Sequence, residues 1–164
     1  SDFQLPWSLS DEITETIKER LIKKNQFYLS PLEETNLLSQ TLTVENNPFN
    51  SDTTWVKETF GNYEFVVFTE MLEHDIHAKE VASTLLDRFI SSAELSLSMR
   101  VRIFDLRSGD PEVILQEIVQ QDHIIPIPSN LNKEGKDRFT KLTFQLSPLG
   151  LAHAQLSKEI ATRI

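Results

Sequence analysis

The clearest structural signal in the chain is the stretch "LSLSMRVRIFDLRSGDPEVILQE" (residues 95–117). Its first half alternates apolar and polar residues, and the apolar set is Leu95, Leu97, Met99, Val101 and Ile103. A period of two predicts a β-strand with one covered face and one exposed face. The segment RSGDP (107–111) then predicts a turn, because glycine permits positive φ and proline cannot donate to a strand ladder. We therefore expect "EVILQEIVQQ" (112–121) to return as an antiparallel partner.

Two amphipathic helices are expected outside these strands. The first begins with Ser8 or Ser10 as N-cap, and its apolar stripe is Leu9, Ile13, Ile17 and Leu21. The second has Ser147 as N-cap and Pro148 as its first residue, and its inward face is Leu149, Leu156, Ile160 and Ile164. Both stripes require a sheet or another helix to cover them.

The intervening segments give weaker patterns. "QFYLSP" (26–31) predicts a short strand, and Pro31 opens a helix through Leu37 and Leu38. A second short helix is expected through Trp55 and Phe60, capped by Asp52 or Thr53 and stopped at Gly61.

"YEFVVFTEML" (63–72) predicts a central strand covered on both faces, because three apolar residues stand in a row. Residues 74–92 fit either a helix with the face Val81, Leu85 and Phe89 or a long excursion between two strands. "IIPIPSNLNKEGKD" (124–137) is too rich in proline, asparagine and glycine for regular structure and predicts a loop.

These elements predict a single domain over residues 1–164 of the α/β (α+β) class. It has a mixed β-sheet with an antiparallel hairpin, packed by the N- and C-terminal helices. The chain begins with Ser1 and not with methionine, and Ile164 completes an apolar helix face without a capping residue. We therefore expect both ends to be truncated.

Charge and composition exclude several functions. The chain has 25 acidic and 16 basic residues, and its formal net charge of −9 repels phosphate backbones, so no nucleic-acid partner is expected. No apolar segment approaches the roughly 20 residues that span a bilayer. There is no cysteine for disulfides or thiol chemistry. Four isolated glycines form no phosphate loop, so no cofactor is expected.

The stretch "EMLEHDIH" (70–77) is the one cluster that suggests a ligand site. It contains Glu73, His74, Asp75 and His77 after a predicted strand, and imidazole and carboxylate groups suit zinc. A solvated turn explains the same residues and is the favoured interpretation, with a metal site as the alternative. His123 and His153 are interpreted as packing or hydrogen-bonding residues, and no catalytic residue is assigned.

Arg100 and Arg102 are expected on the exposed face of the hairpin. The plain interpretation is a solubilising face. The functional alternative is a recognition surface, because a fixed arginine array suits carboxylates on a protein partner. We therefore predict that Arg100 and Arg102 form a partner-binding site.

Four stretches together resemble one family. They are "LSDEITETIKERLIKKNQFYL", "NYEFVVFTEML", "MRVRIFDLRSGDPEVILQE" with Asp105 and Gly109 in matching places, and "SPLGLAHAQLSKEIATRI". They are similar to the periplasmic domains of the curli-secretion lipoprotein and of the lipoprotein activators of penicillin-binding proteins, and to the N-terminal domain of the Tol translocation protein. Chlamydial-type lipoproteins carry related stretches. The resemblance implies the fold and an envelope location.

The expected function is therefore that of a non-enzymatic protein-interaction domain in a bacterial outer-membrane lipoprotein. It would lie on the periplasmic face, held by a lipid anchor upstream of this chain, and bind a protein partner in the envelope. The alternatives are a metal-dependent domain or enzyme centred on Glu73, His74, Asp75 and His77, and a cytosolic adaptor. Partner identity and oligomeric state stay open.

Overall fold

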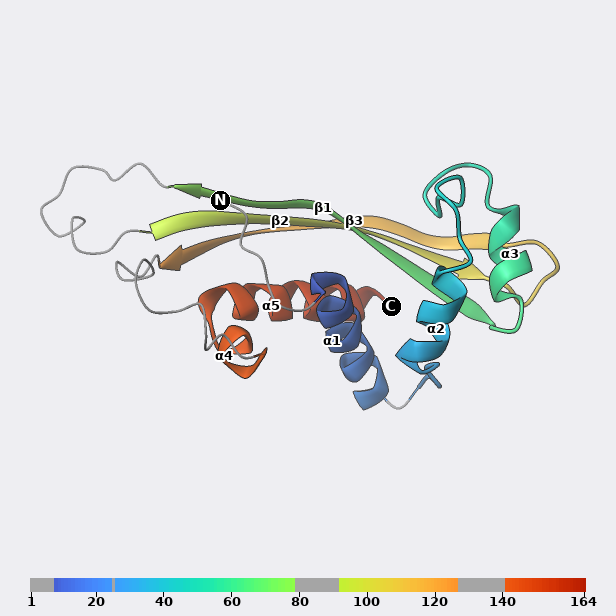
Figure 1. The fold of residues 1–164 in the computed structure, drawn as a ribbon, viewed down its shortest axis with the longest axis horizontal. Coiled ribbons are helices and arrows are strands. Elements are labelled where there is room, and N and C mark those ends of the chain that lie inside the picture. The colour runs from blue at the N-terminus through green and yellow to red at the C-terminus, as the bar shows by residue number, and fades with distance from the viewer. Residues whose placement is uncertain (1–7, 25, 79–91, 127–140) are drawn as a thin grey trace, which may run out of the picture.

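The computed structural model describes residues 8–24, 26–78, 92–126 and 141–164. Its elements, in chain order, are α1 (Leu9–Lys23), α2 (Leu32–Ser39), α3 (Thr54–Phe60), β1 (Phe65–Ala78), β2 (Ser92–Asp105), β3 (Glu112–Pro126), α4 (Lys141–Gln145) and α5 (Pro148–Arg163). Figure 1 shows a long sheet with α1, α4 and α5 on one side and α2 and α3 near the hairpin end.

The described strands form one sheet in the order β1-β2-β3, and both neighbouring pairs are antiparallel. The α+β class with packed N- and C-terminal helices is confirmed, but the described sheet is antiparallel instead of mixed. The strand in "YEFVVFTEML" lies at the edge of the sheet, so its predicted central position is wrong. The predicted coverage of both faces is also wrong, because none of residues 65–77 is buried and Phe65 and Val67 are 36% and 37% exposed. An apolar run alone does not determine which strands flank a strand or how far its faces are covered.

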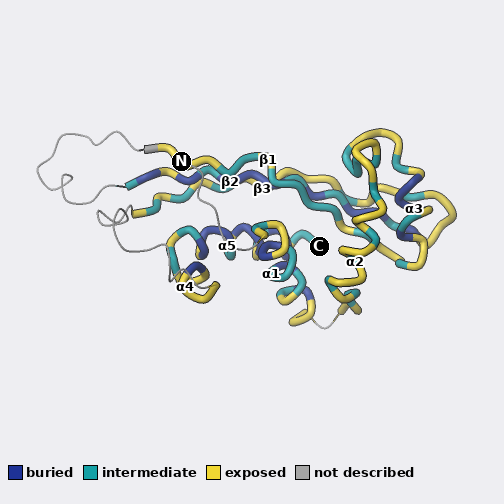
Figure 2. Tube along the Cα trace, viewed as in Figure 1, coloured by how far each residue is buried: buried dark blue, intermediate teal, exposed yellow. Residues whose placement is uncertain are grey.

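The main core lies between the sheet and helices α1 and α5. We call this side of the sheet the helix-covered face; on β2 it carries Leu95, Leu97, Met99, Val101 and Ile103, each at most 6% exposed. Ile13, Ile17 and Leu21 of α1 pack there with Leu156 and Ile160 of α5. Figure 2 shows the buried residues along β2 and the facing helices. Burial of this stripe confirms the alternation predicted for residues 95–103.

The opposite side, the outer face, is packed at the hairpin end. Trp55, Val56 and Phe60 of α3 cover Phe104 and Leu106 there. Phe68 of β1 joins them edge-to-face, with its ring centroid 5.6 Å from that of Phe60 and 5.9 Å from that of Phe104. Among the described residues, helix packing on the outer face is confined to this end.

Helix starts follow the predicted caps. Ser8 Oγ accepts a hydrogen bond from Asp11 N at 3.3 Å, and Ser147 Oγ accepts one from Gly150 N at 3.1 Å. At α3 the side chain of Asp52 accepts from Thr54 N at 3.2 Å, while Thr53 makes no side-chain cap bond. These bonds satisfy amide groups that a helix N-terminus leaves without partners.

Two local predictions differ from the structure. Residues 26–30 form no strand, and Tyr28 is 93% exposed, because no described strand edge pairs with this segment. The turn at residues 107–111 is present, but Gly109 does not adopt the positive φ that the sequence suggested.

Residues 74–78 belong to β1, and residue 92 already belongs to β2. The helix predicted from Val81, Leu85 and Phe89 lies outside the described residues. The loop predicted over residues 124–137 is wrong at its start, because residues 124–126 belong to β3. The rest of that loop lies outside the described residues. β3 itself continues to Pro126, past the expected end of the hairpin partner.

Candidate functional site

The Glu-His-Asp stretch is a strand, and its alternation divides the predicted metal ligands. A bulge at Leu72 lets Met71 pair with Met99 and Glu73 pair with Ser98. Glu73, Asp75 and His77 therefore share the outer face, while His74 lies on the helix-covered face opposite Leu97. The expected loop is wrong, because pairing with β2 overrides the low β-propensity of the acidic residues.

The three outer-face residues remain close together. Glu73, Asp75 and His77 each offer one ligand atom, and these atoms all lie within 4.8 Å of one another. Glu94 pairs with His77 across the strands and is exposed. The arrangement provides two carboxylates and one imidazole, a donor set that suits zinc, on an open surface.

His74 has a different role in the fold. Its Nε2 lies 2.9 Å from Nε2 of His153 on α5, and the two ring centroids are 5.1 Å apart. His123 of β3 also lies on the helix-covered face and is 3.2 Å from Gln121 Oε1 through its Nε2. The plain interpretation of His153 as a hydrogen-bonding residue agrees with these contacts.

His153 is 3% exposed. Its burial, and then the nearby His74 and His123, lower the pKa of His153 from 6.5 to about 4. Removing water from around an imidazole disfavours its charged form. His153 is therefore neutral at physiological pH, and its Nδ1 has no hydrogen-bond partner in the described part of the chain.

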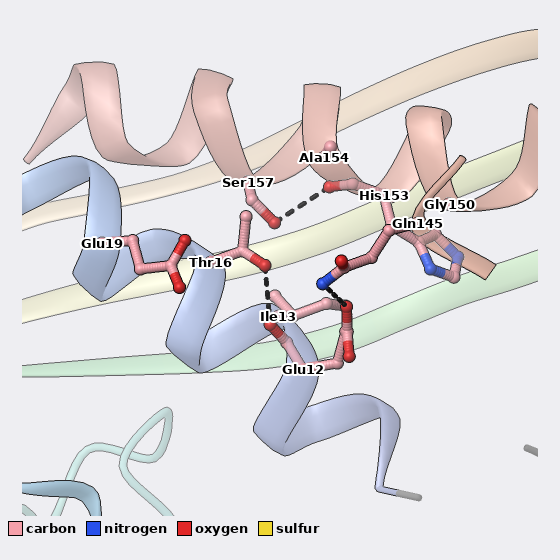
Figure 3. A pocket seen from close by; sticks show the side chains of 9 residues that line it. All are labelled: Glu12, Ile13, Thr16, Glu19, Gln145, Gly150, His153, Ala154 and Ser157. Carbon is pink, nitrogen blue, oxygen red and sulfur yellow. Dashed lines mark hydrogen bonds between the residues drawn. The ribbon is translucent and has the colours of Figure 1, made fainter. Parts of the chain in front are cut away.

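A cavity of about 220 Å³ lies between α1 and α5 beside His153 (Figure 3). Its polar lining includes Glu12, which is 5% exposed. Glu12 Oε1 accepts from Gln145 Nε2 at 3.1 Å, and Lys141 Nζ lies 3.4 Å from Oε2. Gln145 and Lys141 offset part of the cost of burying this carboxylate, while Oε2 has no hydrogen-bond partner in the described part of the chain. The contacts link α1 to α4.

Arg100 and Arg102 both contact their own chain. Arg102 Nη1 donates to the carbonyls of Pro48 and Asn50 at 2.7 and 2.9 Å. Arg100 Nε donates to Glu70 at 3.0 Å, and its guanidinium lies 4.0 Å from the ring centroid of Phe49. The two arginines thus hold the loop at residues 48–50 on the outer face. Whether they also contact a protein partner stays a prediction.

Sequence reasoning grouped four candidate ligands, and the structure keeps three of them together. It missed the contact between His74 and His153, which are 79 positions apart. It also missed the burial of Glu12, because an acid in the first turn of a helix is expected at the surface.

None of the described helices is long and apolar enough to cross a membrane.

The fold and site define an α+β domain in which one antiparallel sheet is covered mainly on one side. The full chain, residues 1–164, matches DUF7499, a family of unknown function, and the chain belongs to this family. It is also similar to the hypothetical protein CT253 from Chlamydia trachomatis, whose structure was solved at 1.65 Å resolution. The TM-score is 0.63 at 27% identity, covering 99% of this chain and 86% of CT253. Comparison with curated proteins found no match.

Proposed function

We propose that this chain is a non-enzymatic protein-interaction domain of a bacterial cell-envelope lipoprotein. The observation that carries the proposal is the part of the outer face that α3 does not cover, which we call the open end. There Ile118 and Ile124 of β3 are 61% and 64% exposed beside the polar positions of β1 and β2. Apolar side chains on an otherwise polar strand face can supply the central contacts of a protein interface, where charged residues are depleted.

The similarity to a chlamydial protein supports a bacterial setting. The resemblance of the β2–β3 hairpin and the closing helix to the curli-secretion, penicillin-binding-protein activator and Tol domains supports the envelope. In this proposal the domain lies on the periplasmic face of the outer membrane and is attached by an upstream lipid anchor. Since fold alone does not determine function, the partner requires direct capture.

Site-specific photo-cross-linking in cells tests the interaction. A photoreactive residue at Ile118 or Gln120 should give a discrete adduct with an envelope protein in the membrane fraction. The same residue at Glu33, exposed on α2, is the control and should give none. Equal adducts from both positions, or recovery of the full-length protein in the cytosol without an adduct, would contradict the proposal.

A metal-dependent function is the second candidate, favoured by the spacing of Glu73, Asp75 and His77. Calorimetric titration with zinc distinguishes the two. Saturable heat in the native protein that disappears in His77→Gln and persists in His74→Gln would support a site on the outer face. Absence of heat at micromolar protein would remove this candidate.

A further inference from the structure

Besides the cavity next to His153, a cleft between α1 and α5 is lined mainly by basic residues. Its volume is about 230 Å³, and its lining is Arg20, Lys23, Lys24, Lys158, Ala161 and Thr162. We call it the basic cleft. Four of its six lining residues are cations and none is acidic, although the whole chain has a formal net charge of −9. Such a local reversal of charge attracts anions against the mean field of the protein.

The arrangement of the two helices creates this cleft. The start of α1 faces the start of α5 around the cavity beside Glu12, whereas residues 20–24 of α1 face residues 158–162 of α5. The helices therefore run in the same direction, and their C-terminal ends lie together. The C-terminal end of each helix carries about half a negative charge.

The cations of the basic cleft neutralise the negative C-terminal ends of the two helices, but this uses only part of their positive charge. Lys24 Nζ donates to the carbonyl of Ala161, and Arg20 Nη2 donates to that of Ala154 at 3.3 Å. Lys23 and Lys158 are exposed, and their side chains make no ion pair or hydrogen bond to another described residue. Four unit charges exceed roughly one unit from two helix ends, so the cleft stays positive.

Arg20 retains donors for a ligand. A guanidinium has five N–H groups. In Arg20, one of these groups, on Nη2, donates to the Ala154 carbonyl. The Nε atom is buried and has no hydrogen-bond partner in the described part of the chain. A planar donor fork flanked by ammonium groups is suited to a tetrahedral oxyanion.

We propose that the basic cleft binds a phosphate group. Arg20 contributes the donor fork, and Lys23 and Lys158 contribute mobile positive charges from the two helices. The phosphate belongs either to an anionic lipid headgroup at a membrane surface or to a free phosphorylated molecule. This site is remote from the open end of the outer face, so it does not depend on the proposed protein partner.

The test uses the whole chain and two probes. The first is sedimentation with vesicles of phosphatidylcholine containing one third phosphatidylglycerol, compared with phosphatidylcholine alone. The second is an NMR titration with inorganic phosphate, compared with chloride at equal ionic strength. We expect saturable binding in at least one arm, with amide shifts centred on Arg20 and Lys158 for phosphate.

The variant K23Q/K158Q should weaken that binding by about tenfold or more, because two charge-assisted contacts are lost. R107E at the hairpin turn is the matched control, since both variants lower the net charge by two units. Binding to anionic vesicles alone identifies a headgroup site, and binding of phosphate identifies a soluble ligand. No binding in either arm, or equal losses in both variants, would overturn the proposal.

Discussion

His74 Nε2 on β1 and His153 Nε2 on α5 lie 2.9 Å apart, so a hydrogen bond joins the edge strand to the closing helix. One imidazole donates and the other accepts, which requires at least one ring to be neutral. Protonation of both rings would replace this bond with repulsion. The packing of α5 against the sheet is therefore coupled to pH.

Acidification should destabilise the protein through His153. Its pKa is about 4 in the folded chain and 6.5 in the unfolded chain, so the unfolded state binds the proton first. The free energy of unfolding should be highest above pH 6.5 and should fall by up to about 3 kcal/mol as the pH drops to 4. Urea denaturation at a series of pH values measures this slope.

The variant His153→Leu should remove that part of the slope, whereas His77→Gln, exposed on the outer face, should retain it. An unchanged slope in His153→Leu would assign the acid sensitivity to other groups.

Burial along α5 predicts unequal costs for two leucines. Leu156 is 0% exposed and packs in the main core, while Leu151 is 57% exposed on the same helix. Leu156→Ala should lower the free energy of unfolding by about 2–5 kcal/mol because it leaves a cavity. Leu151→Ala should change it by less than about 0.5 kcal/mol. Similar losses in guanidinium denaturation would show that α5 is not packed as described.

Substitution of alanine for glycine should destabilise the protein at Gly150, where the backbone is closely packed, but not at Gly109, where space is free. A Cβ at Gly150 would lie 2.0 Å from the carbonyl oxygen of Phe144, whereas a Cβ at Gly109 would meet nothing within 4 Å. Gly150→Ala should therefore cost about 2 kcal/mol or more. Gly109→Ala should be neutral or stabilise by up to about 1 kcal/mol, since it restricts the unfolded chain. Thermal unfolding checks both values, and a tolerated alanine at position 150 would contradict the close approach.

Loss of Arg102 should loosen the loop on the outer face. Arg102→Ala removes the donors to the carbonyls of Pro48 and Asn50 and should cost about 1–2 kcal/mol. Amide exchange of Asn50, whose N–H donates to the Asn47 carbonyl, should accelerate. Arg107→Ala is the comparison, because its ion pair with Asp105 is local and the Arg107 side chain is exposed, so solvent screens the pair and its loss should change stability little. Unchanged exchange at Asn50 would favour a recognition role for Arg102 over a structural one.

The helices and the hairpin are predictable because their signals are local. The apolar stripe from Ile13 to Leu21 and the alternation from Leu95 to Ile103 each require a single covered face, and the structure buries both. Capping by Ser8 and Ser147 likewise depends only on neighbouring amides. Such features survive in almost any tertiary arrangement that covers them.

The site contacts are not predictable from the sequence, because they join distant segments. Arg102 binds backbone carbonyls 52 and 54 positions away, and a carbonyl has no residue-type signature. The pattern of "EHDIH" suggested a solvated loop, since acidic residues disfavour strands. Only its pairing with Glu94–Ser98 on β2 makes it a strand.

The bulge at Leu72 makes one point of β1 tolerant to a change in chain length. Leu72 is the residue that the pairing with β2 skips, and its side chain is 45% exposed. Its deletion would leave Met71 opposite Met99 and Glu73 opposite Ser98, so every later side chain would keep its face. Deletion of Ile76, which lies beyond the bulge, would instead place His77 opposite Leu95 and turn it toward the core. A homologous chain that lacks this one residue would therefore keep the same two surfaces of the sheet.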